Sequence, residues 1–188
     1  QFYIWAADQV APGNPSHNLP VAFRIRGPLD AGILEASFNT VVRRHEALRT
    51  TFSVRNGEPV QVVHPECHIK IASTDLSRLP AGEGRSKLQQ LASGESVAAF
   101  DLARLPLLRV SLYKLADADH VLLVNLHHVV GDGLSIGPLL HELDVLYRAL
   151  ATGSPPRLPD LPIQYADFAS WLRREFSGAS HPAELKSW

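Results

Sequence analysis

Cysteine, methionine and long apolar runs are scarce in this sequence, and each shortage narrows the classes of protein to which it can belong. Cys67 is the only cysteine among 188 residues, so the chain has neither an intramolecular disulfide nor a cluster of thiolate metal ligands. No apolar stretch is long enough to cross a bilayer, and the first residues lack the pattern of a signal peptide. We therefore expect no membrane partner and a cytoplasmic location.

An excess of one charge is also missing. The chain has 18 basic and 19 acidic residues and a formal net charge of −1, which does not favour a nucleic-acid partner. Its hydrophobic content of 45% is typical of a globular protein, and its length suffices for one large domain or two small ones. The chain has no initiator methionine and stops at Trp188, so we expect it to be a piece of something longer.

Apolar residues follow both helical and alternating spacing along the chain. Asp30 is typical of a helix N-cap, and Asn56-Gly57 is a strong hairpin signal. Residues 116–119 are predicted to join two strands into an antiparallel hairpin. No regular alternation of strand and helix is present, which favours an α+β fold, with a mixed sheet and helices on one side. We predict strands at residues 21–26, 48–54, 60–63, 69–71, 107–115 and 120–126, and helices at residues 33–46, 85–99, 134–150 and 163–176.

Residues 121–135 carry the strongest functional signal. An apolar strand ends in His127 and His128, and Asp132 follows between two glycines. Histidine titrates near neutral pH, so it can take and return a proton in the cell. Strand alternation sends the two rings to opposite faces, which allows one to face a cleft and the other to support it. Gly131 and Gly133 permit unusual backbone angles and let a ligand approach the main chain.

A metal site and a serine hydrolase are two alternative interpretations of this segment. His128 and Asp132 supply two potential ligands, but a catalytic zinc commonly takes three, so we expect no metal. Residues 133–137 fit the G-x-S-x-G pattern around Ser135. However, a nucleophile elbow needs its serine on a tight strand-to-helix turn, and the predicted strand ends several residues too early.

Two further clusters stand apart from the histidines. Residues 43–52 are basic, and Arg43 has the ordinary explanation of a helix C-terminus favoured by the helix dipole. Arg49 begins an extended segment, where its guanidinium could pair with a buried carboxylate such as Asp132. The aromatic residues of segment 165–171 have helical spacing, which indicates packing.

Together these clusters resemble the condensation domains of nonribosomal peptide synthetases. Residues 127–133 match the HHxxxDG signature of that family, and residues 44–52 match its RHExLRTxF stretch. Residues 165–171 match YxDFAxW, and residues 1–5 match part of the opening motif, with Tyr3 where arginine is usual. HHxxxDG alone is shared by a wider acyltransferase superfamily, whereas four motifs in this order are far more specific.

The resemblance implies a fold like that of chloramphenicol acetyltransferase, with two similar lobes around a tunnel. Residues 1–152 would form the N-terminal lobe, and residues 153–188 a proline-rich linker and helix leading to a C-terminal lobe that the chain lacks. The full domain would join a carrier-bound acyl or peptidyl donor to an aminoacyl acceptor through a peptide bond. Only one wall of the tunnel is present, so we expect the isolated chain to be inactive.

The resemblance also implies partners. These are the upstream and downstream carrier proteins, the C-terminal lobe and an adjacent adenylation domain. The substrates would ride on the phosphopantetheine arms of the carriers, and the lobe itself would bind no cofactor.

The family motif places His127, His128, Asp132 and Gly133 in the catalytic signature. The resemblance implies that His128 deprotonates or positions the attacking amine and that His127 supports the loop. Gly133 would line the tunnel, and Ser135 would belong to the substrate-binding region.

In the family the aspartate pairs with the arginine that matches Arg49. The resemblance thus implies that Asp132 and Arg49 form a buried ion pair, with Arg44 as a further structural support. Removing one partner of such a pair would cost about 3–5 kcal/mol.

Other members of the superfamily remain as alternatives. An epimerization domain shares HHxxxDG, and a catalytically idle recruitment platform would share the fold. Heterocyclization domains replace the signature with an aspartate-based motif, which does not match residues 127–133.

Overall fold

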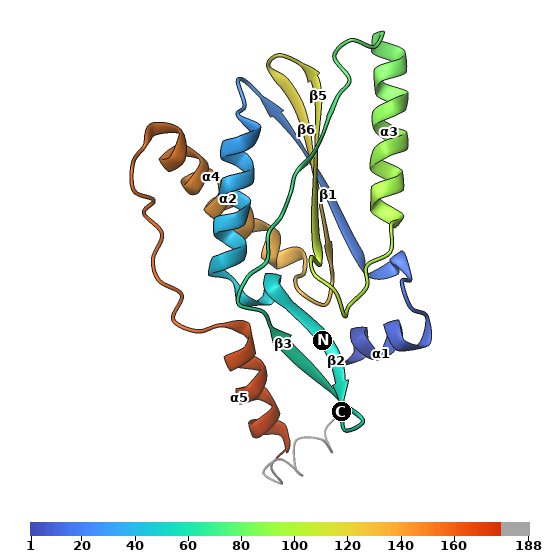
Figure 1. The fold of residues 1–188 in the computed structure, drawn as a ribbon, viewed down its shortest axis with the longest axis vertical. Coiled ribbons are helices and arrows are strands. Elements are labelled where there is room, and N and C mark those ends of the chain that lie inside the picture. Colours follow the sequence, from blue (N-terminus) through green and yellow to red (C-terminus); the bar gives the residue numbers. More distant parts are fainter. Residues whose placement is uncertain (178–188) are drawn as a thin grey trace, which may run out of the picture. The chain divides into compact units, whose positions relative to one another are not determined.

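The computed structural model describes residues 1–177, which fall into two compact units (Figure 1). The first unit is Gln1–Leu158, and the second begins at Pro159. The predicted boundary after residue 152 coincides with the end of helix α4 (Ile136–Thr152). The assignment of residues 1–152 to one lobe stays a prediction. No helix in residues 1–177 is long and apolar enough to span a membrane.

A four-stranded sheet with the order β1-β6-β5-β4 is the centre of the first unit. The pairs β1–β6 and β5–β6 are antiparallel, and β4 pairs with β5 in parallel. The predicted mixed, largely antiparallel sheet is therefore confirmed. Its strands are β1 (Asn18–Arg26), β4 (Ala72–Asp75), β5 (Leu108–Ala116) and β6 (Asp119–His127).

The strand predicted at residues 69–71 is wrong, because pairing starts only at Ala72. A side chain replaces the neighbouring strand at this point. The Asn39 amide donates to the Ile69 carbonyl at 2.9 Å, and the Ile69 N–H donates to Asn39 Oδ1 at 2.8 Å. Both backbone groups of Ile69 are thus paired without a sheet.

Strands β2 (Thr50–Arg55) and β3 (Glu58–Val63) form a separate antiparallel hairpin. The turn residues Asn56 and Gly57 both have positive φ, 53° and 81°, as the primed hairpin turns require. This prediction is confirmed. The first two residues of the strand predicted at residues 48–54 are not extended, because the 3₁₀ helix η2 (Glu46–Arg49) directly precedes β2.

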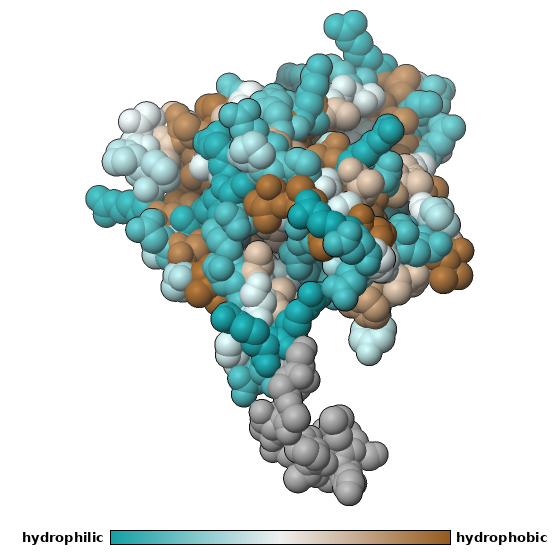
Figure 2. Space-filling view, turned by 60° about the horizontal axis from the view of Figure 1, so that its bottom comes forward, coloured by the Kyte–Doolittle hydropathy of each residue, from teal (hydrophilic) through white to brown (hydrophobic). Residues whose placement is uncertain are grey.

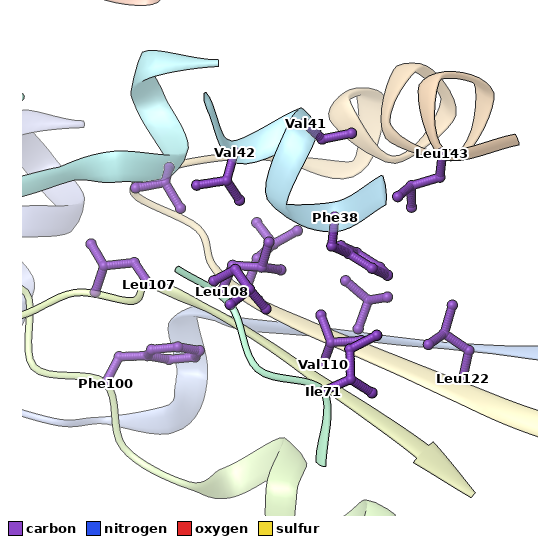
Figure 3. Close-up of a cluster of buried hydrophobic side chains, with 14 of the residues drawn as sticks. Phe38, Val41, Val42, Ile71, Phe100, Leu107, Leu108, Val110, Leu122 and Leu143 are labelled. Atoms are coloured by element: carbon purple, nitrogen blue, oxygen red, sulfur yellow. The ribbon is translucent and has the colours of Figure 1, made fainter. Parts of the chain in front are cut away.

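Helices α2 (Ala31–Arg44) and α4 cover one face of the sheet. The Asp30 carboxylate accepts the N–H groups of Gly32 and Ile33, so the predicted N-cap is confirmed. Figure 3 shows side chains of both helices pointing toward those of the strands. The buried residues at this interface include Phe38, Val41 and Val42 of α2, Leu143 of α4, and Leu108, Val110 and Leu122 of the sheet.

Helix α3 (Ala81–Val97) covers the opposite face, so the prediction of helices on one side is wrong. Leu88 and Leu91 of α3 pack against Tyr113 and Leu123, whose side chains leave the sheet on that face. The helix has few apolar residues and several glycines and glutamines, which weakens the sequence signal for a buried side. Figure 1 shows α3 and α2 with the sheet strands between them.

The remaining helices of the first unit are short. They are α1 (Phe2–Val10), η1 (Pro15–His17) and η3 (Gly133–Ser135).

Figure 2 shows hydrophobic side chains in separate groups among hydrophilic ones on the face that it presents.

The second unit contains helix α5 (Tyr165–Ser177). The rings of Tyr165 and Phe168, and those of Phe168 and Trp171, have centroids within 6 Å of each other. All three side chains are exposed. The aromatic stripe therefore packs along its own helix and is not buried in a core.

Candidate active site

The two histidines lie where β6 ends and a turn begins. His127 is the last residue of the strand, and His128 is the first of the turn. Three backbone hydrogen bonds hold this turn. The N–H of His127 donates to Leu107, that of His128 to His17, and that of Val130 to His127, at 2.8–3.0 Å. The position of the His128 backbone is thus set by the segments that contain Leu107 and His17.

The His127 ring is a buried support for the turn. Its side chain is 2% exposed, and Nδ1 accepts the Val129 N–H at 3.2 Å. Burial lowers the pKa of His127 to about 4, with Asp8 opposing this and His17 adding to it. The ring is therefore neutral at pH 7, and its proton is on Nε2 because Nδ1 is an acceptor.

His128 has the opposite environment. It is partly exposed, and within residues 1–177 its ring makes no hydrogen bond. A partly exposed imidazole on a backbone held by its neighbours has the properties of a general base or of a hydrogen-bond partner for a substrate.

Asp132 lies on the surface and caps the short helix η3. Its Oδ1 accepts the Ser135 N–H at 2.9 Å and the Ser135 hydroxyl at 2.7 Å, and Ser135 Oγ accepts the Asp132 N–H. The hydroxyl bond is the main cause of a lowered pKa of Asp132. Ser135, which was predicted as substrate-binding, is thus occupied in a capping box with Asp132.

The predicted buried ion pair between Arg49 and Asp132 is not formed in this structure. Arg49 donates to the His64 carbonyl at 2.5 Å and to the Glu46 carboxylate at 3.2 Å. The physical reason for the difference is local. Asp132 is exposed and already bonded to Ser135, whereas the Arg49 guanidinium is turned toward the β2–β3 hairpin.

Arg44, at the C-terminal end of α2, forms an ion pair that joins this helix to α4. It donates to Glu142 of α4 at 3.1 Å, and the His45 ring lies 2.8 Å from the second oxygen of the same carboxylate. Glu142 is only 7% exposed. Residues 128–133 form the loop that contains His128 (the His128 loop), and α4 begins at Ile136, just after η3. These contacts therefore connect the end of α2 to the helix that follows the His128 loop.

Neither glycine of the loop adopts the left-handed conformation, so the expectation of unusual backbone angles there is wrong. A Cβ on Gly131 would lie 2.9 Å from the Leu126 side chain, which explains a small residue at that position. A Cβ on Gly133 would meet no described atom within 4 Å. The space beside Gly133 is thus open to a ligand.

Sequence reasoning missed several residues that hold the loop. The Gln1 side chain donates to the Val129 carbonyl at 2.8 Å and accepts from Gln61 at 2.9 Å. His17 supplies the carbonyl that accepts the His128 N–H. Only Gln1 had a sequence signal, its place in the opening motif. His17 and Gln61 come close through the fold.

The geometry does not favour the two alternative interpretations, a metal site and a serine hydrolase. Within the described part of the chain, no group of three or more His, Cys, Asp or Glu side chains is arranged to hold a metal. Ser135 lies in η3 after the His128 turn, and its hydroxyl donates to Asp132. It therefore does not sit on the strand-to-helix elbow of a serine hydrolase.

A cavity of about 290 Å³ lies at the far end of β6 from the histidines. Its lining includes Arg24, Leu88, Asp119 and Val121. Because β6 runs from Asp119 to His127, none of the predicted site residues contributes to this cavity.

Sequence comparisons relate the chain to large peptide synthetases. The family model described as Condensation domain matches residues 1–186. A linear gramicidin synthase protein of Brevibacillus parabrevis is 39% identical over 185 residues, which are 98% of this chain and 2% of that protein. Phosphinothricin tripeptide synthetase PhsB of Streptomyces viridochromogenes is 40% identical over 98% of this chain and 15% of its own length.

Solved structures have the same fold. The starter condensation domain of rhizomide synthetase matches with a TM-score of 0.85 and 21% identity over 95% of this chain and 44% of that chain. The X-domain from teicoplanin biosynthesis matches with a TM-score of 0.82 and 28% identity over 96% of this chain and 38% of that one. The chain thus spans less than half the length of these structures and a small part of the curated relatives.

Proposed function

This chain belongs to the condensation-domain family, and we propose that it forms the N-terminal lobe of a domain that makes peptide bonds between carrier-bound substrates. In this reaction the amine of an aminoacyl acceptor attacks the thioester of an acyl or peptidyl donor. The single observation that supports the proposal most is the placement of His128, partly exposed at the end of β6 on a backbone held by His17.

The proposed role of His128 is to hold or accept the proton of the attacking amine. The imidazole must be neutral for this, and it must come within about 3 Å of the amine nitrogen. His127 cannot take this role, because it is buried and its Nδ1 already accepts the Val129 N–H. It keeps the turn in shape instead.

The proposed substrates enter on the phosphopantetheine arms of two carrier proteins, an upstream donor and a downstream acceptor. The open space beside Gly133 suits the passage of a thioester. The second wall of the tunnel would come from a C-terminal lobe, which agrees with the share of 38–44% that this chain covers in the solved structures. The adjacent adenylation domain and a cytoplasmic location are proposed from the family context.

The test is single-turnover condensation by the complete domain with loaded donor and acceptor carriers. We expect His128→Gln to lower the rate about 10²–10⁴-fold, since it removes a positioned acid–base group. His141→Gln is the matched control, because His141 is an exposed histidine on α4. A His128→Gln variant that is folded and condenses at the wild-type rate would contradict the proposed role.

A non-catalytic recruitment platform is the second candidate. The observation that favours it is the 29% identity and TM-score of 0.78 to the X-domain in its complex with OxyB. The same experiment separates the two candidates. A wild-type complete domain that forms no peptide bond with any loaded carrier pair would favour the platform.

A further inference from the structure

A layer of polar and aromatic contacts connects the end of α3 to His127, and the function proposed above does not use it. Arg109 of β5 is its centre. The guanidinium donates to Glu95 Oε1 at 2.6 Å and to the carbonyls of Ala98 and Ala99 at 2.6 and 2.9 Å. All these acceptors lie at or just after the C-terminal end of α3, where backbone carbonyls have no partner within the helix.

The same guanidinium lies over the ring of Phe100, with 3.7 Å between its central carbon and the ring centroid. This is the distance of a cation–π contact. Phe100 is 5% exposed and is labelled at the side of the core cluster in Figure 3. Its ring is therefore held between a fixed cation and the protein interior.

The other neighbour of Phe100 is His127. The two rings have a centroid distance of 5.9 Å and an interplanar angle of 72°, an edge-to-face contact. The His127 ring in turn accepts the N–H of Val129, the residue after His128. A rotation of the His127 ring would break this bond and leave the Val129 N–H without that acceptor, next to His128.

We propose that Arg109 is a positioning residue of the His128 loop and acts on it through Phe100 and His127. This inference rests on the proposed condensation activity of the complete domain. Arg109 does not touch the loop. Its effect is to hold Phe100 in the one orientation that fixes the His127 ring and, through Val129, the direction of His128.

The test uses Arg109→Met in the complete domain and measures kcat, KM for the loaded acceptor carrier, and thermal unfolding. We expect kcat to fall about tenfold, because misplaced catalytic groups lower rates without a change of chemistry, while KM changes less than about twofold. Arg109→Lys keeps the charge but lacks the planar fork of donors that bonds Glu95, Ala98 and Ala99 from three nitrogens, so we expect an intermediate kcat. If the Arg109→Met variant does not fold, the kcat of Arg109→Lys is the measurement that tests the proposal.

Arg24→Met is the matched control. Arg24 forms an ion pair with Asp119 on the same sheet, at the end away from the histidines. We expect this variant to keep the wild-type kcat. A folded Arg109→Met variant with the wild-type kcat, or a loss no larger than its unfolded fraction, would overturn the proposal.

A double-mutant cycle tests the route. If Arg109 acts on the loop through Phe100 and His127, Arg109→Met should have no further effect on kcat in a His127→Gln background. Additive losses would show that Arg109 acts elsewhere and would overturn the route.

Histidine NMR separates this proposal from the proposed function. If the wild-type domain forms no peptide bond, the proposed condensation activity is contradicted, and the positioning proposal is still testable. The His127 and His128 ring resonances still report the positioning, because they should move in Arg109→Met and stay in Arg24→Met. Unchanged resonances in both variants would overturn the positioning role.

Discussion

The two faces of the four-stranded sheet are built from different chemistry. The face toward α2 and α4 is largely apolar, with His120 as a buried polar residue at the end away from His127, and Phe38 and Val42 of α2 are fully buried against it. The face toward α3 is apolar at Tyr113 and Leu123 and toward the end away from the histidines, where Leu115 and Val121 pack against the same cluster. At the end near the histidines it carries Asn125 and His127, both buried, and the partly buried Arg109. The first face provides non-directional stability, and the second fixes orientations, because hydrogen bonds have geometry.

The largest effect is expected on the apolar face. Phe38→Ala should lower the free energy of unfolding by about 3–5 kcal/mol, since it leaves a cavity in a packed core. Chemical denaturation of the 188-residue chain measures this change. Val10→Ala, at an exposed residue of α1, should stay within about 0.5 kcal/mol. A small loss for Phe38→Ala would mean that this face is not the main source of stability.

The polar face should make stability depend on pH through His127. The unfolded histidine titrates near 6.5, whereas the pKa of the folded one is about 4. Between these values the unfolded state binds more protons, so stability falls as the pH falls. At about 1.4 kcal/mol per pH unit, the loss is on the order of 3 kcal/mol. Denaturation curves from about pH 7 to about pH 4 measure it.

The comparison for this pH effect is His127→Gln, which has no titrating ring. Its stability should fall less over the same interval, whatever its value at neutral pH. Equal slopes for the two proteins would show that His127 is not the group responsible.

A smaller effect is expected at the contact between the sheet and the end of α3. The Asn125 amide donates to the Glu95 carbonyl at 2.7 Å, but its own Oδ1 is buried and has no hydrogen-bond partner among residues 1–177. Asn125→Leu loses one bond and removes one unsatisfied oxygen, so we expect a cost of about 1 kcal/mol. Asn39→Leu loses two bonds to Ile69 and should cost more. The reverse order in denaturation experiments would contradict this account.

The smallest effect on stability is expected in the loop itself. Gly133→Ala should change the free energy of unfolding by less than about 0.5 kcal/mol, because its new methyl group meets open space. In the complete domain it should still lower condensation about 10- to 100-fold if a thioester passes there. Gly131→Ala is the contrast, since its Cβ would press on Leu126. An unchanged condensation rate for Gly133→Ala would argue against passage at this point.

Local signals predicted most of the elements. Asn56-Gly57 makes its turn because these residues tolerate positive φ, and Asp30 caps α2 because its carboxylate reaches the N–H groups of Gly32 and Ile33. The strand at residues 69–71 failed because Asn39, far away in sequence, takes the hydrogen bonds of Ile69. The sequence did not predict that α3 covers the opposite face of the sheet, because the apolar pattern of this helix is weak.

In the site, alternation along β6 indicated that His127 and His128 differ in environment, and the fold places one inside and the other partly outside. The prediction that Asp132 pairs with Arg49 was wrong, because Asp132 instead forms a capping contact with Ser135, three residues away. The contacts of Gln1 and His17 with the turn, and the contact of Arg109 with Phe100, had to come from the structure.

The sequence by itself determined the helices with strong periodicity, the two hairpins, the condensation-domain family and the segment that carries the histidines. These depend on interactions between near neighbours along the chain or on motifs readable in order. Only the tertiary structure decided which face α3 covers, what Arg49 and Asp132 bind, and how Arg109 reaches His127 through Phe100. Such contacts join residues far apart in sequence, and their energies depend on distances and angles that exist only after the chain has folded.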